Sequence, residues 1–400
     1  MSGDGMNEHE QGEGPANSAE HAVPEDAGTT PGTVPGGRPD ADDAAATATT
    51  AAAADDDPAA PPRKRSRLRR VLISLGVLAL VLALAVGGGA WFLVHRYASN
   101  VERVSDVFDS LDETARPAEA SPTATEAVSA EPITFLLVGS DTRADIASGE
   151  LPDARSDAIM IARFSADREH AQIISIPRDS WVDIPGYGKN KINAAYAYGG
   201  PTLLIQTVEN VTGVRIDHYA AIDFDGLIDV TDALGGVDVY VAETTTWGDY
   251  TFTAGINHLD GDAARWYVGQ RYDLPGGDFD RVKRQQNYLR SMFTQLFSKG
   301  VFTSPTELNS VLTTVTSSIA VDDSLSTTDM LTMAYSLKGL TPDTVDFFTA
   351  PVLGTGTEGS ASVVYLDTNT GARMWGYLNT DSLSQNADEF SDEALSDTPN

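Results

Sequence analysis

The sequence predicts a layered α/β domain, preceded by an acidic disordered tail and one transmembrane helix. Short apolar runs of strand length alternate with helix-length segments between residues 131 and 382, which is the pattern of a layered domain. The run Val71–Val94 contains 24 residues without a charge. Residues 1–62 carry thirteen acidic residues and one basic residue without a hydrophobic period, and such a segment buries too little apolar surface to fold.

The run Val71–Val94 is long enough to cross a bilayer. At about 1.5 Å per residue it extends about 36 Å as a helix, against a hydrocarbon core of about 30 Å. Residues 63–70 form a basic juxtamembrane segment with six Lys and Arg, whereas only Arg96 follows the run closely. The positive-inside rule then places the N-terminus in the cytoplasm. We expect a single-pass protein of the cell membrane with its main domain outside the cell; a cleaved signal peptide, the alternative, has a shorter apolar run.

The part of the chain after the anchor divides into a stalk, a domain and a tail. In residues 95–130, Val101, Val104 and Val107 recur at helical spacing, which predicts a short amphipathic helix in a stalk, followed by a linker. The domain is predicted at residues 131–382 and the last eighteen residues, 383–400, are predicted to be a loose acidic tail. Within the domain, the predicted strands are Ile133–Val138, Ala158–Phe164, Ala171–Ile176 and Gly236–Val241, and the predicted helices are Thr202–Thr212 and Arg281–Lys299.

The composition excludes several classes of chemistry. The chain has no Cys and six His without metal-binding spacing, so thiolate zinc sites, iron–sulfur clusters and Cys nucleophiles are ruled out. The net charge of −31 argues against nucleic acid as a partner, because binding polyphosphate requires many cations. The available chemistry comes from carboxylates, Arg, Lys and hydroxyl groups.

Cations gather at a few loop junctions of this acidic chain. Arg155 precedes one predicted strand, Arg178 follows another, and Arg271 and Arg281 bracket the glycine-rich segment 275–278. Carboxylates lie beside the same strands, at Asp141 and Asp157. Such a set either balances guanidinium charge structurally or holds a divalent cation while Arg grips phosphate oxygens. Pyrophosphate bridged by magnesium satisfies the second interpretation.

Together these segments resemble the LytR-CpsA-Psr family, and the spelling of the loop Leu274–Asp278 resembles its actinobacterial members. The motifs follow the order of the family over about 150 residues: Leu137–Arg143, Arg155–Asp157, Ser175–Asp179, Lys191–Tyr196, Gly235–Val239, and Gly277–Arg281 with Arg284–Gln286. The resemblance implies an α/β/α sandwich around a mixed sheet. It also implies a phosphotransferase that moves a glycopolymer from a polyprenyl-pyrophosphate carrier onto a muramic acid hydroxyl of peptidoglycan.

The resemblance further implies roles for individual residues. Magnesium, or manganese, is expected on Asp141 and Asp157. Pyrophosphate is expected on the residues that match the basic and amide positions of the family: Arg155, Arg178, Lys191, Arg271, Arg281 and Gln285. We expect Arg178, Asp179 and Arg271 to act in catalysis, with Asp179 orienting or deprotonating the acceptor hydroxyl; pairing with a neighbouring Arg is the alternative role for Asp179. One position departs from the family, since Gly269 stands where an Arg is usual; Arg265, one helical turn earlier, is a candidate substitute.

The hydrocarbon tail of the carrier requires an apolar site. Candidate segments are Leu203–Ile205 with Val208, and the apolar positions of residues 289–297: Leu289, Met292, Phe293, Leu296 and Phe297. Ordinary core packing is the alternative for each of them. His218, His258, Trp247 and Trp266 are interpreted as structural. Two other functions remain open for the chain as a whole: a magnesium-dependent pyrophosphatase of polyprenyl pyrophosphates, and a non-catalytic receptor or regulator at the wall.

Overall fold

A computed structural model describes residues 100–119, 131–140, 156–298 and 305–399 of this protein, with side chains omitted for 305–308. The expected cytoplasmic tail (1–62), basic segment (63–70) and transmembrane run (71–94) lie outside these residues, as do Asp141 and Arg155. Among the helices that the structure describes, none combines the length and the apolar character needed to span a bilayer.

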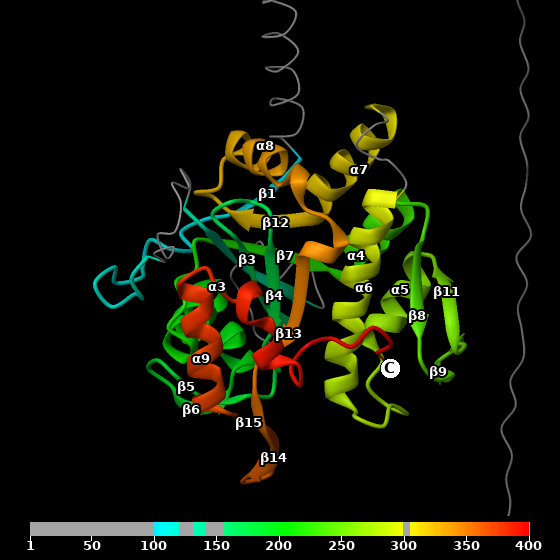
Figure 1. Ribbon diagram of the computed structural model, residues 1–400. Coiled ribbons are helices and arrows are strands. Elements are labelled where there is room, and N and C mark those ends of the chain that lie inside the picture. Colours follow the sequence, from blue (N-terminus) through cyan, green and yellow to red (C-terminus); the bar gives the residue numbers. More distant parts are fainter. Residues whose placement is uncertain (1–99, 120–130, 141–155, 299–304, 400) are drawn as a thin grey trace, which may run out of the picture. The chain divides into compact units, whose positions relative to one another are not determined.

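A seven-stranded mixed sheet forms the centre of the domain (Figure 1). Its strands in spatial order are β1 (Glu102–Val104), β12 (Ile319–Asp322), β7 (His218–Asp223), β2 (Ile133–Ser140), β3 (Ser156–Phe164), β4 (Ala171–Ser175) and β13 (Val345–Thr349). The pairs β1–β12, β2–β7 and β4–β13 are parallel, and the other three are antiparallel. The mixed α/β fold with a central mixed sheet is therefore confirmed.

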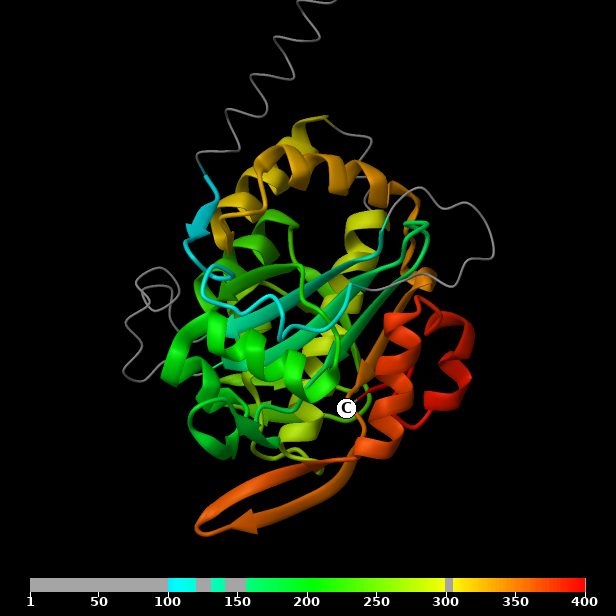
Figure 2. The same cartoon turned by 90° about the vertical axis from the view of Figure 1, so that its left-hand side faces the viewer.

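Helices cover both faces of this sheet (Figures 1 and 2). The helices are α3 (Asn193–Thr212), α4 (Phe224–Ala233), α5 (Gly261–Gly269), α6 (Asp278–Ser298), α7 (Pro305–Ser318), α8 (Thr327–Ser336) and α9 (Thr368–Asn379), with 3₁₀ turns η2 (Leu337–Gly339), η3 (Pro342–Thr344) and η4 (Ser384–Phe390). The central strands are apolar runs because both of their faces are buried. Leu136 and Ile161 pack into the cluster of α3 and α9, whereas Phe135 and Ile173 pack into the cluster of α6 and α8.

The described residues also form four two-stranded antiparallel sheets outside the central sheet. They are β5 (Trp181–Ile184) with β6 (Gly188–Lys191), β8 (Val237–Val241) with β11 (Gly255–Leu259), β9 (Thr245–Trp247) with β10 (Tyr250–Phe252), and β14 (Val352–Glu358) with β15 (Ala361–Leu366). The predicted strand at 236–241 is thus a strand, but it pairs with β11 outside the central sheet. Figures 1 and 2 show the β14–β15 hairpin protruding from the domain.

The segment predicted as a stalk helix belongs to the sheet. Residues Glu102–Val104 form β1, which pairs in parallel with β12, and Val107 is fully buried. Farther along, the Arg116 guanidinium binds the buried carboxylate of Glu209 on α3 at 2.8 Å. The helix prediction was wrong because three spaced valines are too few to establish a helix, and pairing with β12 gives Glu102–Val104 backbone hydrogen bonds in the sheet.

The C-terminal residues predicted as a loose tail are packed on the domain. Leu383 and Phe390 are buried, and the N–H of Thr349 donates to Glu393 O at 2.8 Å while the N–H of Leu395 donates to Phe347 O at 2.9 Å. This segment covers β13, the edge strand of the sheet, whose backbone groups otherwise lack partners. The acidic composition of residues 383–400 predicted a loose tail, although the buried residues Leu383 and Phe390 anchor the segment.

Replacing Arg290 with alanine tests how the end of the chain is held. The Arg290 guanidinium donates to Ser396 O at 3.0 Å and to Asp397 O at 3.2 Å. We expect Arg290→Ala to speed amide hydrogen exchange in residues 395–399 and to lower the free energy of unfolding by about 1–3 kcal/mol. Thr294→Ala, one turn later on α6, is the matched control; equal exchange in both variants would contradict this attachment.

Candidate active site

Two arginines from different elements converge on Asp157. Asp157 is the second residue of β3, Arg178 follows the end of β4, and Arg281 lies in the first turn of α6. The Arg178 guanidinium forms an ion pair with Asp157 Oδ1, and the Arg281 guanidinium lies 3.4 Å from the same oxygen. The sequence prediction that these residues meet is therefore supported by the geometry.

A second carboxylate, Asp278, completes this group. Its Oδ1 lies 2.8 Å from the Arg281 guanidinium and 3.6 Å from Arg178 Nε. We did not assign Asp278 to the site from the sequence, although it lies in the glycine-rich segment that Arg271 and Arg281 bracket. Its spacing of three residues from Arg281 suggested no more than an ordinary pair within a helix turn.

Helix α6 is docked so that its first turn meets the strand ends. The buried amide of Gln286 donates to Ser175 Oγ at 2.9 Å and to Phe348 O at 2.6 Å. Ser175 ends β4, three residues before Arg178, so this contact sets the distance between the two arginines. A buried amide that bridges a helix and two strands fixes their relative position because leaving it unpaired is unfavourable.

The charges of this group favour an anion. Burial lowers the pKa of the Arg281 guanidinium, and the charges of Arg178 and Arg271 act in the same direction, against the carboxylates of Asp278 and Asp157. Arg281 is only 3% exposed, and a guanidinium keeps its charge in proteins. The Nε groups of Arg178 and Arg281 are buried and make no hydrogen bond, although Arg178 Nε lies 3.6 Å from Asp278 Oδ1. Two guanidinium groups with remaining hydrogen-bonding capacity at one place can bind phosphate oxygens.

Arg271 lies at the rim of this group on the loop after α5. It is exposed, and its charge acts on Arg281. Gly269, two residues earlier, has no atom within 4 Å of the position that a Cβ would take, so the space is open where the family usually has an Arg. The Arg265 guanidinium lies 5.4 Å from the centre of the Phe224 ring.

Asp179 forms an ion pair with Lys191 at 3.0 Å. Its alternative role, pairing with a neighbouring cation, is thus realised, with Lys191 in place of an Arg. Because Asp179 directly follows Arg178 and Lys191 ends β6, the pair lies next to the arginine group. A carboxylate at this position can accept a hydrogen bond from a hydroxyl group.

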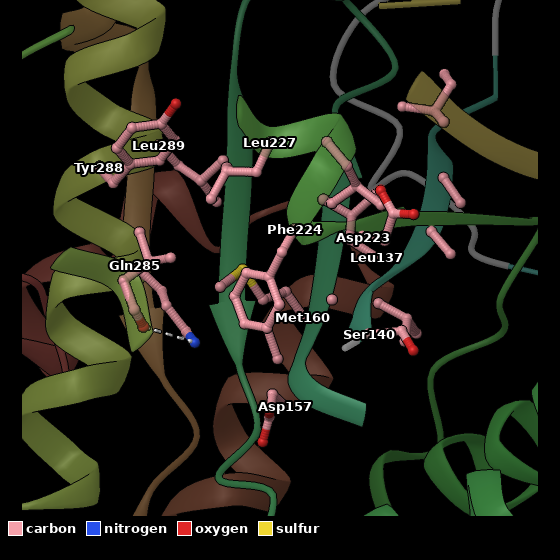
Figure 3. Close-up of a pocket in the computed structure, with 18 residues that line it drawn as sticks. Leu137, Ser140, Asp157, Met160, Asp223, Phe224, Leu227, Gln285, Tyr288 and Leu289 are labelled. Carbon is pink, nitrogen blue, oxygen red and sulfur yellow. Dashed lines mark hydrogen bonds between the residues drawn. The ribbon is translucent and has the colours of Figure 1, made fainter. Parts of the chain in front are cut away.

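An apolar cavity of about 210 Å³ adjoins the charged group. It lies between the sheet and helices α4, α5 and α6, and Figure 3 shows Gln285, Tyr288 and Leu289 projecting from α6 toward it. Five residues with polar side chains line the cavity: Ser140, Asp157, Asp223, Gln285 and Tyr288. Most of the remaining lining is apolar and includes Leu137, Met160, Ile222, Phe224, Leu227, Val268, Leu289 and Ile319. In the same view Asp157 lies at one end of the group of side chains. The Gln285 amide donates to Val268 O at 3.4 Å, which joins α6 to α5 across the wall.

Of the two aspartates predicted to bind a metal, Asp157 is among the described residues and Asp141 lies outside them. Within the described ranges, no group of three or more His, Asp or Glu side chains is arranged to hold a metal. Magnesium, however, commonly binds one or two carboxylates together with substrate phosphates and water. Asp157 and Asp278 both contact Arg281, so hard oxygen donors are available where such an ion would bind.

Comparison with known proteins shows to which family this chain belongs. The profile of the LytR_cpsA_psr family matches residues 98–379. This chain belongs to the LytR_cpsA_psr family. Among its curated relatives, the cell wall biosynthesis protein LcpA of Corynebacterium glutamicum is 34% identical over 279 residues, covering 59% of this chain and 53% of LcpA. The chain thus spans about half the length of that relative.

Two further relatives agree with this assignment. The polyisoprenyl-teichoic acid–peptidoglycan teichoic acid transferase TagU of Enterococcus faecalis is 35% identical over 231 residues, covering 57% of this chain and 74% of TagU. The crystal structure of B. subtilis TagV superimposes with a TM-score of 0.53 at 26% identity, covering 62% of this chain and 97% of TagV. The resemblance inferred from the motifs is confirmed.

The cavity of this LytR_cpsA_psr domain has a different lining from the one we expected. Leu289 lines it, but Leu204, Ile205 and Val208 pack on the opposite face of the sheet. The other expected residues of α6 pack in neighbouring core clusters: Met292, Phe293, Leu296 and Phe297. Helical spacing identifies apolar faces, but it does not tell which face another element covers. No sequence pattern indicated Phe224 or Ile319, because each follows or begins an ordinary buried strand.

Proposed function

We propose that this protein transfers a glycopolymer from a polyprenyl-pyrophosphate carrier to a hydroxyl of peptidoglycan, forming a phosphodiester. One observation carries the proposal: Arg178 and Arg281 adjoin an apolar cavity through Asp157, which contacts both arginines and lines the cavity. A ligand that satisfies both parts has a diphosphate head and a hydrocarbon tail. The names of TagU, a polyisoprenyl-linked teichoic acid transferase, and of LcpA, a cell wall biosynthesis protein, support the same assignment.

The described residues suit an in-line displacement at phosphorus. The acceptor hydroxyl oxygen attacks the phosphorus that bears the sugar, the bond from that phosphorus to the bridging oxygen breaks, and polyprenyl phosphate leaves. Arg178 and Arg281 neutralise the charge that develops on the phosphate oxygens, and Arg271 adds positive charge at the exposed edge of this arginine group. Asp179, 3.0 Å from Lys191, accepts the hydroxyl proton.

Magnesium, when bound, would supply further charge neutralisation on the pyrophosphate oxygens. Asp157 would hold it together with Asp141, and Asp278 brings a third carboxylate to the same group. Positioning accounts for most of the remaining catalysis, since phosphoryl transfer asks for little covalent chemistry from the protein.

The proposed substrates place this domain outside the cell. The run Val71–Val94 would anchor it as a single-pass membrane protein with residues 1–62 in the cytoplasm. Protease added to intact cells would then remove the domain and leave an N-terminal tag protected. Protection of a C-terminal tag would contradict this orientation.

Transfer can be measured with full-length protein in detergent. The protein is incubated with a lipid-linked pyrophosphoryl oligosaccharide, magnesium and peptidoglycan fragments, and the expected product is oligosaccharide joined to peptidoglycan through phosphate. Release of oligosaccharide phosphate without joining would instead support a pyrophosphatase, and binding without turnover would support a receptor.

Filling the cavity is expected to weaken binding of the lipid tail and not of the pyrophosphate. Ala158 lines the cavity beside Asp157, so Ala158→Phe places a ring where the tail begins. We expect about tenfold weaker binding of undecaprenyl pyrophosphate and little change for inorganic pyrophosphate, measured by calorimetry. Ala372→Phe, at a separate hollow beside α9, is the matched control. An equal loss for both ligands would argue against the cavity as the tail site.

A further inference from the structure

Four aromatic side chains gather beside Arg271, and we call them the aromatic ledge: Trp247, Tyr250, Trp266 and Tyr272. They come from β9, β10, α5 and the loop after α5; Figure 1 shows β9 near α5, toward the end of the domain where α6 begins. Trp247 and Tyr272 stack with ring centres 5.4 Å apart, and Tyr250 and Trp266 stack at 6.0 Å. Trp247 meets Trp266 edge-on at 6.5 Å, which joins the two pairs.

The ledge presents aromatic surface to solvent. Tyr272 is 57% exposed and Trp266 is 37% exposed, although both residues belong to a packed group of rings. Core packing alone does not account for such exposure, because large aromatic side chains gain most when they are covered. Exposed aromatic rings next to a charged site are typical of a ligand contact.

Buried polar contacts hold the ledge in place. The Gln270 amide donates to Tyr272 O at 3.1 Å, and its Oε1 accepts a hydrogen bond from Arg284 at 2.6 Å. Both Gln270 and Arg284 are fully buried. Gly248, at φ +60°, packs so closely on Trp266 that an added Cβ would lie 2.9 Å from the ring. The ledge is therefore ordered before any ligand binds, which lowers the entropic penalty of binding.

The ledge begins where the pyrophosphate site ends. The Arg271 guanidinium lies 5.2 Å from the centre of the Tyr272 ring, and its charge also acts on Arg281. In the proposed donor, one phosphate carries the polyprenyl chain and the other carries a sugar. In this proposal the cavity binds the polyprenyl tail and the arginines bind the pyrophosphate. The sugar is then the part of the donor that has no binding surface assigned to it.

The charge around the ledge favours a neutral sugar over a membrane surface. Desolvation and the carboxylates of Asp262, Asp260 and Asp249 raise the pKa of the Tyr250 hydroxyl, and Asp273 is exposed beside Tyr272. An acidic rim repels an anionic bilayer, which attracts basic segments. The same carboxylates accept hydrogen bonds from sugar hydroxyl groups.

We propose that the aromatic ledge binds the neutral pyranose ring joined to the pyrophosphate of the donor, with Tyr272 as its main contact. The C–H face of a pyranose is apolar and flat enough to pack on an aromatic ring, while its hydroxyl groups reach the acidic rim. This inference rests on the proposed function and extends it, because it makes the ledge a determinant of which first sugar is accepted.

Binding of two matched ligands tests the assignment. Full-length protein in detergent with magnesium is titrated with geranyl pyrophosphate capped by a methyl ester and with geranyl-pyrophosphoryl-N-acetylglucosamine, which carry the same charge and differ in the sugar. We expect the wild-type protein to bind the sugar-bearing ligand about tenfold more tightly. Tyr272→Ala is expected to remove this preference, lowering affinity for the sugar-bearing ligand much more than affinity for the capped geranyl pyrophosphate, and Tyr272→Phe, which keeps the ring, to retain it. Tyr335→Ala, at a tyrosine on α8 that is 70% exposed, is the control.

Three outcomes overturn the assignment in different ways. Equal affinity of the wild-type protein for both ligands removes the sugar subsite and leaves the pyrophosphate site intact. Failure to bind the capped geranyl pyrophosphate removes the proposed function itself, and the ledge assignment with it. Binding of the wild-type protein, but not of Tyr272→Ala, to phosphatidylglycerol vesicles would identify the ledge as a membrane contact.

Discussion

Replacing Arg178 with alanine is expected to slow glycopolymer transfer by about 100- to 1000-fold and to leave the fold intact. Arg178 contacts Asp157, and its buried Nε lies 3.6 Å from Asp278 Oδ1 without forming a hydrogen bond. Removing one preorganised donor to a developing oxyanion typically has an effect of this size. The fold is expected to persist because Arg281 still pairs with both carboxylates.

The measurement is kcat/KM for transfer, together with the midpoint of urea unfolding. Arg373→Ala on α9, which removes an exposed pair with Glu389, is the control for loss of a surface arginine. Arg178→Lys is expected to recover only part of the rate, because an ammonium keeps the charge but not the two-pronged contact. Full activity of Arg178→Ala would mean that the pyrophosphate binds elsewhere.

The convergence of Asp157, Arg178 and Arg281 was predictable because strand ends are recognisable in the sequence. The runs that became β2, β3 and β4 are apolar on both faces, so their ends are marked by the first polar residues. Motifs placed at those ends meet in space whatever the details of the loops. Asp278 escaped this reasoning because it lies within a helix turn, where a nearby Arg has an obvious local partner.

Elements that depend on long-range contacts were not predictable in the same way. β1 consists of three residues that form a strand only because β12 offers an edge, and the C-terminal segment is ordered because β13 offers another. The lining of the cavity depends on how helices α4, α5 and α6 pack on the sheet. A single sequence shows which faces are apolar, but the partner of each face follows from the packing of the whole domain.

Asp157→Asn is expected to abolish transfer at low magnesium and to require at least about tenfold more magnesium for half-maximal activity. Asp157 is a hard oxygen donor in contact with two arginines, and carboxylates of this type hold Mg²⁺ beside substrate phosphates. The negative charge of Asp157 could balance the arginines or could bind the ion. The two roles differ in how activity responds to added magnesium. Loss of charge balance alone lowers the maximal rate and leaves the magnesium midpoint in place, whereas loss of a ligand shifts the midpoint.

The experiment is a magnesium titration of transfer after dialysis against EDTA, with wild type, Asp157→Asn and Asp278→Asn compared. We expect the wild-type protein to lose activity on dialysis and to regain it with Mg²⁺ or Mn²⁺. A shifted midpoint in Asp157→Asn but not in Asp278→Asn would mean that Asp278 pairs with Arg178 and Arg281 without binding the ion; a shift in both would add Asp278 to the ligands. Wild-type activity that survives EDTA would exclude the ion from the reaction. Asp157 and Asp278 would then serve to hold the two guanidinium groups in place until the pyrophosphate displaces the carboxylates.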